Sequence, residues 1–387
     1  MFLVSLPRPH QKDTHMQTLA YGTQDMSAGL SPVRFTRQPV RAGEVEIEIT
    51  HCGVCHSDLH QARDDWGNTV YPCVPGHEII GTVVKTGEGV SRFSKGDTVG
   101  VGCMVNSCQT CEACQRGEEQ YCSGPKSCTL TYNGPKIPDG TNSYGGYATG
   151  IIAREEFVLK IPDAISPAEA APILCAGVTT YSPMKHWKLQ KGQSLGVAGI
   201  GGLGHMAVQI GKALGAEVTA LTTSADKSDL AHDLGATFVI VMSDAGALED
   251  GAQSLDMLID TIPYAHDITP YLKLMKPGGV IALVGNFIEM PAFVPADLVF
   301  HRLTLAGSLI GGIADTVEVL ELCAQHGIRP RIELIEMDAI NDAFKRMEGE
   351  DVRFRHVIDM SGLKSRRDEL GRDAREIAAP SRGDITG

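Results

Sequence analysis

The stretch Ser194-Leu195-Gly196-Val197-Ala198-Gly199-Ile200-Gly201-Gly202-Leu203-Gly204 decides the fold of the C-terminal half of this chain. The apolar run that ends at Ala198 predicts a buried strand, and the following glycines match G-x-G-x-x-G before a helical pattern that continues to about Leu214. In such a unit Gly199 makes the tight turn, Gly201 lets the backbone approach a pyrophosphate, and Gly204 allows close packing of helix on strand. We expect a dinucleotide-binding loop, with a glycine-rich turn that holds no ligand as the alternative. Its residues are Gly199, Gly201, Gly202, Leu203 and Gly204.

Strand and helix patterns alternate after residue 190. The expected strands cover 194–198, 217–221, 238–241, 255–260, 280–284 and 303–308, with helical patterns between most of them. Apolar strands that alternate with helices predict a parallel sheet covered on both faces. We therefore expect an α/β fold whose residues 178–312 form a Rossmann-type, doubly wound domain.

The end of the second expected strand indicates which dinucleotide binds. NAD-binding proteins place Asp or Glu about 20 residues beyond the loop, where it binds the ribose 2′-hydroxyl. Here the strand ends in Thr222-Thr223-Ser224, with Lys227 just beyond and no acid at the tip. A carboxylate would repel a 2′-phosphate, whereas hydroxyl groups and an ammonium group would accept it. The sequence favours NADP(H); alternatively Lys227 is a solvated helix residue and either cofactor binds.

The rest of the chain has a different pattern of apolar residues. Short runs at 45–49, 80–84 and 97–101, separated by glycine-containing turns, predict a compact β domain over residues 1–177. An amphipathic helix at 315–325 and a strand at 353–360 predict that residues 313–360 return to this domain. The tail, 361–387, is dense in charges and then in Pro, Ser and Gly, so we expect a solvated helix that frays into disorder.

Composition excludes several classes of partner. The chain has 387 residues, enough for two domains, and its net charge of −13 argues against nucleic acid. No apolar run approaches the roughly 20 residues that span a bilayer. The N-terminal Met1–Leu6 segment is too short for a signal core and lacks a cationic lead. We expect a cytoplasmic protein whose 11 cysteines are thiols or metal ligands.

Cys108, Cys111, Cys114 and Cys122 form a C-x2-C-x2-C-x7-C run. Four thiolates at this pitch can close a tetrahedron around Zn²⁺, with metal–sulfur distances of about 2.3 Å. Disulfides and an iron–sulfur cluster are the alternatives, but disulfides suit small secreted domains, which this chain does not resemble. The run predicts a structural zinc site.

A second group of ligand-type residues is scattered along the chain. Cys55 lies in Cys52–His60, His77 in Pro75–Glu78, and Cys175 in a later apolar segment. Two thiolates and an imidazole can hold a zinc ion and leave its fourth position open. Because the spacing is long, packed thiols in a core are an equally simple interpretation at this point.

Together these motifs resemble the zinc-containing medium-chain alcohol dehydrogenases. The resemblance is carried by Gly53–Asp58, Gly76–Glu78, the four-cysteine run, Cys175 and the glycine loop, over residues 20–360. Cys55–His60 and the Thr-Thr-Ser…Lys end resemble the cinnamyl-alcohol-dehydrogenase-type branch of NADPH-dependent aldehyde reductases. The resemblance implies a GroES-like, β-rich catalytic domain joined to the Rossmann-type domain, and a homodimer formed by edge pairing of the two nucleotide-domain sheets.

The resemblance also implies roles for individual residues. Cys55, His77 and Cys175 would bind the catalytic zinc, so that each chain holds two zinc ions. Glu78 would visit the metal during ligand exchange or accept a hydrogen bond behind the ligands, and Asp58 would fix the tautomer of His77.

The remaining implied roles concern the proton and the cofactor. Ser57 and His60 would form the proton path, although His60 by itself reads as an ordinary half-exposed histidine. His56 would lie near the pyrophosphate and Thr179 beside the nicotinamide.

The expected activity is zinc-dependent interconversion of primary alcohols and aldehydes with NADP(H), acting on small molecules. Leu130 stands where the plant enzymes carry a Trp in the lid region, which favours a broad-range aldehyde reductase; Trp66 is a second candidate for the pocket wall. An NAD-dependent zinc polyol or secondary-alcohol dehydrogenase is the alternative enzyme. A zincless or non-catalytic nucleotide-binding protein would require loss of ligands that are all present here.

Overall fold

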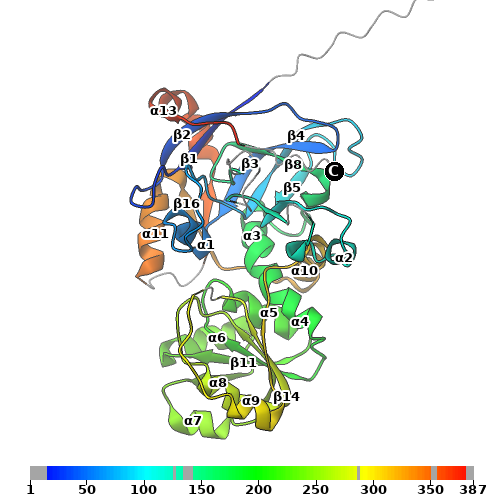
Figure 1. Ribbon diagram of the computed structural model, residues 1–387, viewed down its shortest axis with the longest axis vertical. Coiled ribbons are helices and arrows are strands. Elements are labelled where there is room, and N and C mark those ends of the chain that lie inside the picture. Colours follow the sequence, from blue (N-terminus) through cyan, green and yellow to red (C-terminus); the bar gives the residue numbers. More distant parts are fainter. Residues whose placement is uncertain (1–14, 125–127, 134–142, 286–287, 350–354, 381–387) are drawn as a thin grey trace, which may run out of the picture.

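Two bodies of different construction lie end to end in the computed structural model (Figure 1). The structure describes residues 15–124, 128–133, 143–285, 288–349 and 355–380. Parts of three expectations, at 1–14, 353–354 and 381–387, lie outside these residues. None of the helices in the described part of the chain has both the length and the hydrophobicity that a bilayer crossing requires.

A six-stranded parallel sheet forms the centre of one body. Its strands, in spatial order, are β12 (Phe238–Val241), β11 (Glu217–Thr222), β10 (Ser194–Ala198), β13 (Leu255–Asp260), β14 (Met275–Leu283) and β15 (Thr304–Gly307). All six predicted strands are present, which confirms the doubly wound arrangement. β14 begins at Met275 rather than at residue 280, because Met275 already pairs with Leu255 ahead of a register shift.

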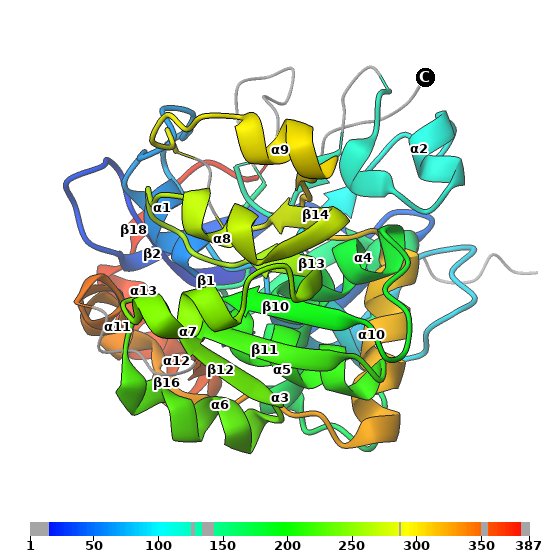
Figure 2. The ribbon, with the colours of Figure 1, turned by 90° about the horizontal axis from the view of Figure 1, so that it is seen from below.

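Helices cover both faces of this sheet (Figure 2). One set comprises α4 (Val178–His186), α5 (Gly204–Ala213) and α6 (Ser228–Leu234); the other comprises α7 (Ala245–Asp250), α8 (Thr269–Leu274) and α9 (Ala296–His301). Alternate strand residues belong to two separate cores: Val197 packs on the first side, and Ala198 packs with Leu272 on the second. The chain leaves β10 toward β11 on one side and reaches β13 on the other, so a crevice opens at the carboxyl ends of these strands.

The other body is β-rich, as expected. A seven-stranded sheet contains β16 (Ile332–Glu336), β17 (Arg355–Asp359), β3 (Glu44–Gly53), β4 (Ile79–Thr86), β5 (Thr98–Val101), β9 (Leu159–Lys160) and β8 (Gly150–Arg154). Smaller sheets pair β1 (Met16–Gly22) with β2 (Ser31–Arg37), and β6 (Met104–Asn106) with β7 (Thr129–Leu130). β17 pairs with β3, so the chain does return to the first body after the parallel sheet.

Helices connect and flank the β-rich body. They are α1 (His56–Ala62), α2 (Glu112–Gln115), α3 (Pro167–Pro172), α10 (Ile313–His326) and α11 (Ile340–Glu348). A π-helical turn, Ile173–Gly177, joins α3 to α4 without a break. The expected domain boundary at residue 177 therefore falls inside a continuous helical passage between the two bodies.

The tail contains helix, as expected, but between residues 361 and 380 it is docked on the β-rich body rather than frayed into disorder. It forms α12 (Ser361–Ser365), α13 (Arg367–Asp373) and β18 (Arg375–Glu376), and β18 pairs with β2. The physical reason is that a few apolar side chains suffice to dock a charged segment. Leu363 and Ala374 are buried in the core of the β-rich body, and Leu370 and Ile377 pack against it.

Candidate active site

Cys55, His77 and Cys175 meet at one point although they come from separate segments. Cys55 precedes α1, His77 lies in the extended segment before β4, and Cys175 lies in the π-helical turn. Their ligand atoms and one carboxylate oxygen of Glu78 all lie within 4.8 Å of one another. His77 Nε2 is 3.3 Å from Cys175 Sγ. A tetrahedral zinc ion would separate such nitrogen and sulfur ligands by about 3.6 Å, so the donor set fits zinc.

The Asp58 carboxylate holds the metal-ligand group in place through hydrogen bonds. This buried carboxylate accepts hydrogen bonds from the backbone N–H of Cys55 at 2.8 Å, the backbone N–H of Gly76 at 2.9 Å and the Tyr147 hydroxyl at 3.0 Å. His77 Nδ1 lies 3.0 Å from the same carboxylate. A carboxylate at Nδ1 keeps the proton on that nitrogen, so the lone pair of Nε2 faces the other ligands.

Glu78 is the fourth member of the group and forms a close, fully buried ion pair with Arg355 of β17. Gly53 is required here, because a Cβ atom would overlap the Glu78 carboxylate. Arg355 also lies against the glycine loop, where a Cβ on Gly202 would come within 2.9 Å of its Cδ. Arg355 thus joins the ligand group to the loop. Sequence reasoning missed it, because β17 also contains His356 and Asp359 and a charged residue there carries no distinct signal.

The two thiols of the group differ in their electrostatics: hydrogen bonds with Cys103 and Cys55, together with burial, raise the pKa of Cys175, whereas Cys55 favours the thiolate form. The hydrogen bond from Cys175 lowers the pKa of the Cys55 thiol well below its ordinary value, against the effect of burial, and the positive charge of Arg355 acts in the same direction. A thiolate is the form that binds a metal.

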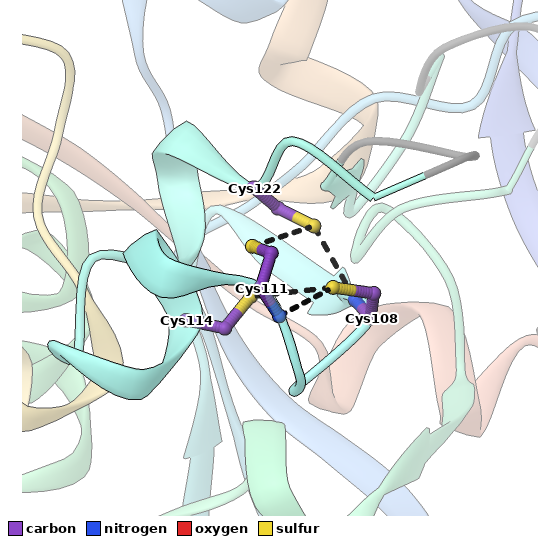
Figure 3. Close-up of side chains that lie close together, drawn as sticks. All are labelled: Cys108, Cys111, Cys114 and Cys122. Atoms are coloured by element: carbon purple, nitrogen blue, oxygen red, sulfur yellow. Dashed lines mark hydrogen bonds between the residues drawn. The ribbon is translucent and has the colours of Figure 1, made fainter.

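The side chains of the four cysteines in the run lie close together, with their sulfur atoms near one another (Figure 3). The Sγ atoms of Cys108 and Cys114 lie 3.9 Å apart, as do those of Cys111 and Cys122. Four sulfurs at zinc-bonding distance would be about 3.8 Å apart, so this tetrad fits a zinc ion with no open position. Backbone N–H groups, first that of Cys114, lower the pKa of Cys111 to about 5. All 11 cysteines are free, which leaves no disulfide to compete with this arrangement.

A cleft of about 920 Å³ runs between the two bodies and past the open ligand group. Gly199, with φ of +84°, makes the turn after β10. A Cβ on Gly204 would overlap the Gly199 carbonyl, whereas a Cβ on Gly201 would meet nothing within 4 Å. The chain itself therefore needs the first and last of these glycines, while the space beside Gly201 is open to a ligand.

Several residues that line the cleft carry buried polar atoms without hydrogen-bond partners among the described residues, and two of them are His56 and Thr179. The atoms are His56 Nε2 and Thr179 Oγ1. Buried polar atoms are normally satisfied, so such orphans indicate a missing polar ligand. The sequence predicted His56 near the pyrophosphate and Thr179, one turn beyond Cys175, beside the nicotinamide; both line the cleft, and their roles remain predictions.

Comparisons with known proteins now bear on this geometry. Residues 41–163 match the alcohol dehydrogenase GroES-like domain, and residues 202–325 match the zinc-binding dehydrogenase domain. The chain belongs to the zinc-binding alcohol dehydrogenase family. It is 44% identical to a probable mannitol dehydrogenase of Mesembryanthemum crystallinum, over 90% of this chain and 97% of that protein. It is also 44% identical to the aldehyde reductase YahK of Escherichia coli K12, over 89% and 98%. The crystal structure of CAD, a cinnamyl alcohol dehydrogenase, from Helicobacter pylori with NADP(H) superimposes with a TM-score of 0.82 at 37% identity, over 90% and 99% of the two chains.

The two residues expected to carry the proton both lie at the cleft of this alcohol dehydrogenase fold. Ser57 and His60 both line the cleft, and Ser57 Oγ lies 3.7 Å from Cys55 Sγ. His60 Nδ1 is 2.7 Å from Asp65 Oδ2, and the His60 ring lies 5.6 Å from that of Trp66. Sequence reasoning missed Asp65, because a carboxylate five residues after a histidine is unremarkable until a helix end turns the two together.

The far end of the cleft holds the expected cofactor-specificity residues. Thr223 and Lys227 are exposed and line it, whereas Thr222 is buried and its hydroxyl bonds the backbone of Ser224 at 3.3 Å. Thr222 therefore shapes the turn more than it faces a ligand. Three acids that follow the strand, Asp226, Asp229 and Asp233, also line the cleft; the sequence argument considered only the tip of the strand.

Proposed function

We propose that this protein is a zinc-dependent oxidoreductase that reduces aldehydes to primary alcohols with NADPH and catalyses the reverse oxidation with NADP⁺. One observation carries the proposal: two thiols and an imidazole from distant segments converge at a cleft whose other wall is a G-x-G-x-x-G loop. Three protein ligands leave zinc a position for substrate oxygen, and the loop accepts a pyrophosphate. The likeness to an aldehyde reductase and to an NADP(H) complex supports the reaction class and the cofactor.

The residues of the chain supply placement and proton transfer. When bound, zinc would polarise the substrate carbonyl as a Lewis acid and the nicotinamide would donate the hydride. Asp58 holds His77 so that its Nε2 faces the metal position. Ser57 and His60 deliver the proton that completes the alcohol, and the Asp65 carboxylate keeps His60 Nδ1 protonated, which leaves Nε2 to exchange the proton. In the oxidation direction the same path removes the proton.

The cleft wall favours a broad substrate range. Trp66, Ile288 and Ile310 line it with apolar surface, and Leu130 is not among the lining residues. Leu130 instead packs beside the four-cysteine tetrad. Medium aliphatic and aromatic aldehydes match such a wall better than polyols, which need buried hydrogen-bond partners.

An NADPH-oxidation screen over aldehydes of graded size tests this function. We expect turnover with several medium-sized aldehydes, a preference for NADPH over NADH, and two zinc ions per chain. A preference for NAD⁺ with polyols or secondary alcohols would favour the alternative enzyme, in line with the mannitol dehydrogenase relative. Absence of turnover in zinc-loaded protein with either cofactor would refute both.

The proposal extends to a homodimer in a reducing compartment. β15 is the edge strand of the parallel sheet, and α9 beside it exposes Val299 and Phe300 by 75% and 83%. Exposed apolar side chains next to an unpaired strand edge support association of two copies. Eleven free thiols support the cytoplasm. Sedimentation equilibrium should give twice the chain mass, and Phe300→Glu should give the monomer mass.

A further inference from the structure

Ile310 has an unusual backbone conformation at the cleft. Its φ is +37°, in the left-handed region, and its side chain lines the cleft. A β-branched residue rarely adopts positive φ, and such strain persists only where the surroundings enforce it. The next residue, Gly311, lies so close to Val178 that a Cβ atom would clash with it. Val178 lies between Cys175 and Thr179 in the chain, and both of these residues line the same cleft as Ile310.

The surroundings that enforce this conformation belong to the four-cysteine lobe, residues 107–122. The backbone N–H of Leu309 donates to the Tyr121 hydroxyl at 2.9 Å. The backbone N–H of Ile313, the first residue of α10, donates to a carboxylate oxygen of the buried Glu119 at 3.0 Å. The two bonds hold the chain on both sides of Ile310.

Packing adds to these bonds. A Cβ on Gly312 would overlap the carbonyl of Gly117, so the two backbones touch directly. Ile310 and Ile313 pack against a small core that contains Cys114 and Cys122, two of the sulfurs of the tetrad. Figure 1 shows the lobe, labelled α2, beside α10.

We infer that Tyr121 and Glu119 are positioning residues, through which the four-cysteine lobe holds Ile310 as a fixed wall at the substrate end of the cleft. The inference rests on the proposed aldehyde reduction for its substrate, but the contacts themselves do not. On this account the lobe does more than stabilise the fold: it sets how long an aldehyde fits beside the metal. Neither residue touches the substrate.

Tyr121→Phe removes the acceptor for Leu309, and Glu119→Leu removes the acceptor for Ile313. In zinc-loaded protein we expect the ratio of kcat/KM for a long to that for a short straight-chain aldehyde to change by about tenfold in the double variant. Most of the change should appear in KM, with two zinc ions still bound per chain. Glu119→Gln keeps an oxygen at the same place and should stay near wild type. Arg116→Ala is the matched control, because Arg116 lies in the same lobe and, among the described residues, its side chain bonds to the exposed Glu112 and the half-buried Glu118 but not to the segment around Ile310.

Hydrogen exchange of the peptide that contains 308–314 gives a second readout without catalysis. Exchange should quicken in both Tyr121→Phe and the double variant, and not in Arg116→Ala. Unchanged exchange together with an unchanged chain-length ratio would overturn the inference. If the double variant does not fold, Tyr121→Phe alone, which removes a single oxygen, carries the test. Failure of the wild type to reduce any aldehyde would refute the proposed function, while the exchange result would still decide the positioning role.

Discussion

The two cysteine-based sites differ in how they are built. The tetrad takes all its sulfurs from one short segment, Cys108–Cys122, and half of them are partly exposed. The open group takes Cys55, His77 and Cys175 from three distant segments, and every donor is buried. A local site needs only its own loop, whereas a long-range site exists only when the whole β-rich body has folded. This difference explains why one fits a structural metal and the other a reactive one.

The largest effect should follow from removal of a ligand at the open group. His77→Ala takes away the one nitrogen donor, so one zinc ion per chain should be lost and aldehyde turnover should fall by about 10³-fold or more, because a Lewis acid contributes several kcal/mol. Metal analysis and steady-state kinetics measure both. Cys323→Ala, a buried thiol in α10 outside both sites, should keep two zinc ions and activity. Full turnover by a His77→Ala protein that holds one zinc ion per chain would show that the open group is not the catalytic site.

Removal of a ligand from the tetrad should act on stability instead. Cys111→Ser also costs one zinc ion, but we expect the loss to appear as a lower melting temperature, because binding of a structural metal contributes directly to folding. Differential scanning calorimetry with and without added zinc checks this. An unchanged melting temperature would mean that the lobe folds without metal.

The ion pair behind the open group comes next. Arg355→Met would leave the Glu78 carboxylate buried without a cation, which should lower the free energy of unfolding by about 3–5 kcal/mol. The double variant Glu78→Gln/Arg355→Met removes both charges and should recover part of that loss. Denaturant titrations of the three proteins measure it. Equal stability of wild type and Arg355→Met would show that the pair does not hold Glu78.

The difference between local and long-range sites also determines how much can be predicted from the sequence. The tetrad, the glycine loop and most strands follow from spacings of a few residues, so they were predicted with nearly correct bounds. The Glu78–Arg355 pair was not, because it depends on the pairing of β17 with β3, which no local pattern encodes. The docked tail was missed for a related reason: its charges dominate the composition, while Leu363 and Leu370 provide the contact.

A smaller effect is expected at Asp58, which contacts the ligand His77 and is not itself a metal ligand. Asp58→Asn keeps the size of the side chain but replaces the carboxylate that faces His77 Nδ1. Such changes lower metal affinity by about 10–100-fold. Competition with a fluorescent zinc chelator measures the affinity of the open group, and the tetrad serves as an internal control because its affinity should not change. Loss of zinc from the tetrad instead would contradict the assignment of Asp58.

The smallest effect concerns the far end of the cleft. Thr223→Asp places a carboxylate where Thr223 is exposed to the cofactor end. Repulsion of a 2′-phosphate should shift the ratio of kcat/KM for NADPH over NADH by about tenfold or more toward NADH. Thr222 is the poorer choice because it is buried. If wild type already prefers NADH, Asp226 and Asp229 dominate this end and the charge argument is wrong.

The central claim is that two thiolates and an imidazole hold a zinc ion opposite the nicotinamide. Crystals grown with zinc and NADP⁺ and measured at the zinc absorption edge test it most directly. We predict two anomalous peaks per chain, one inside the tetrad and one bonded to Cys55, His77 and Cys175 across the cleft from the nicotinamide ring. A single peak in the tetrad, with those three side chains turned apart, would contradict the account.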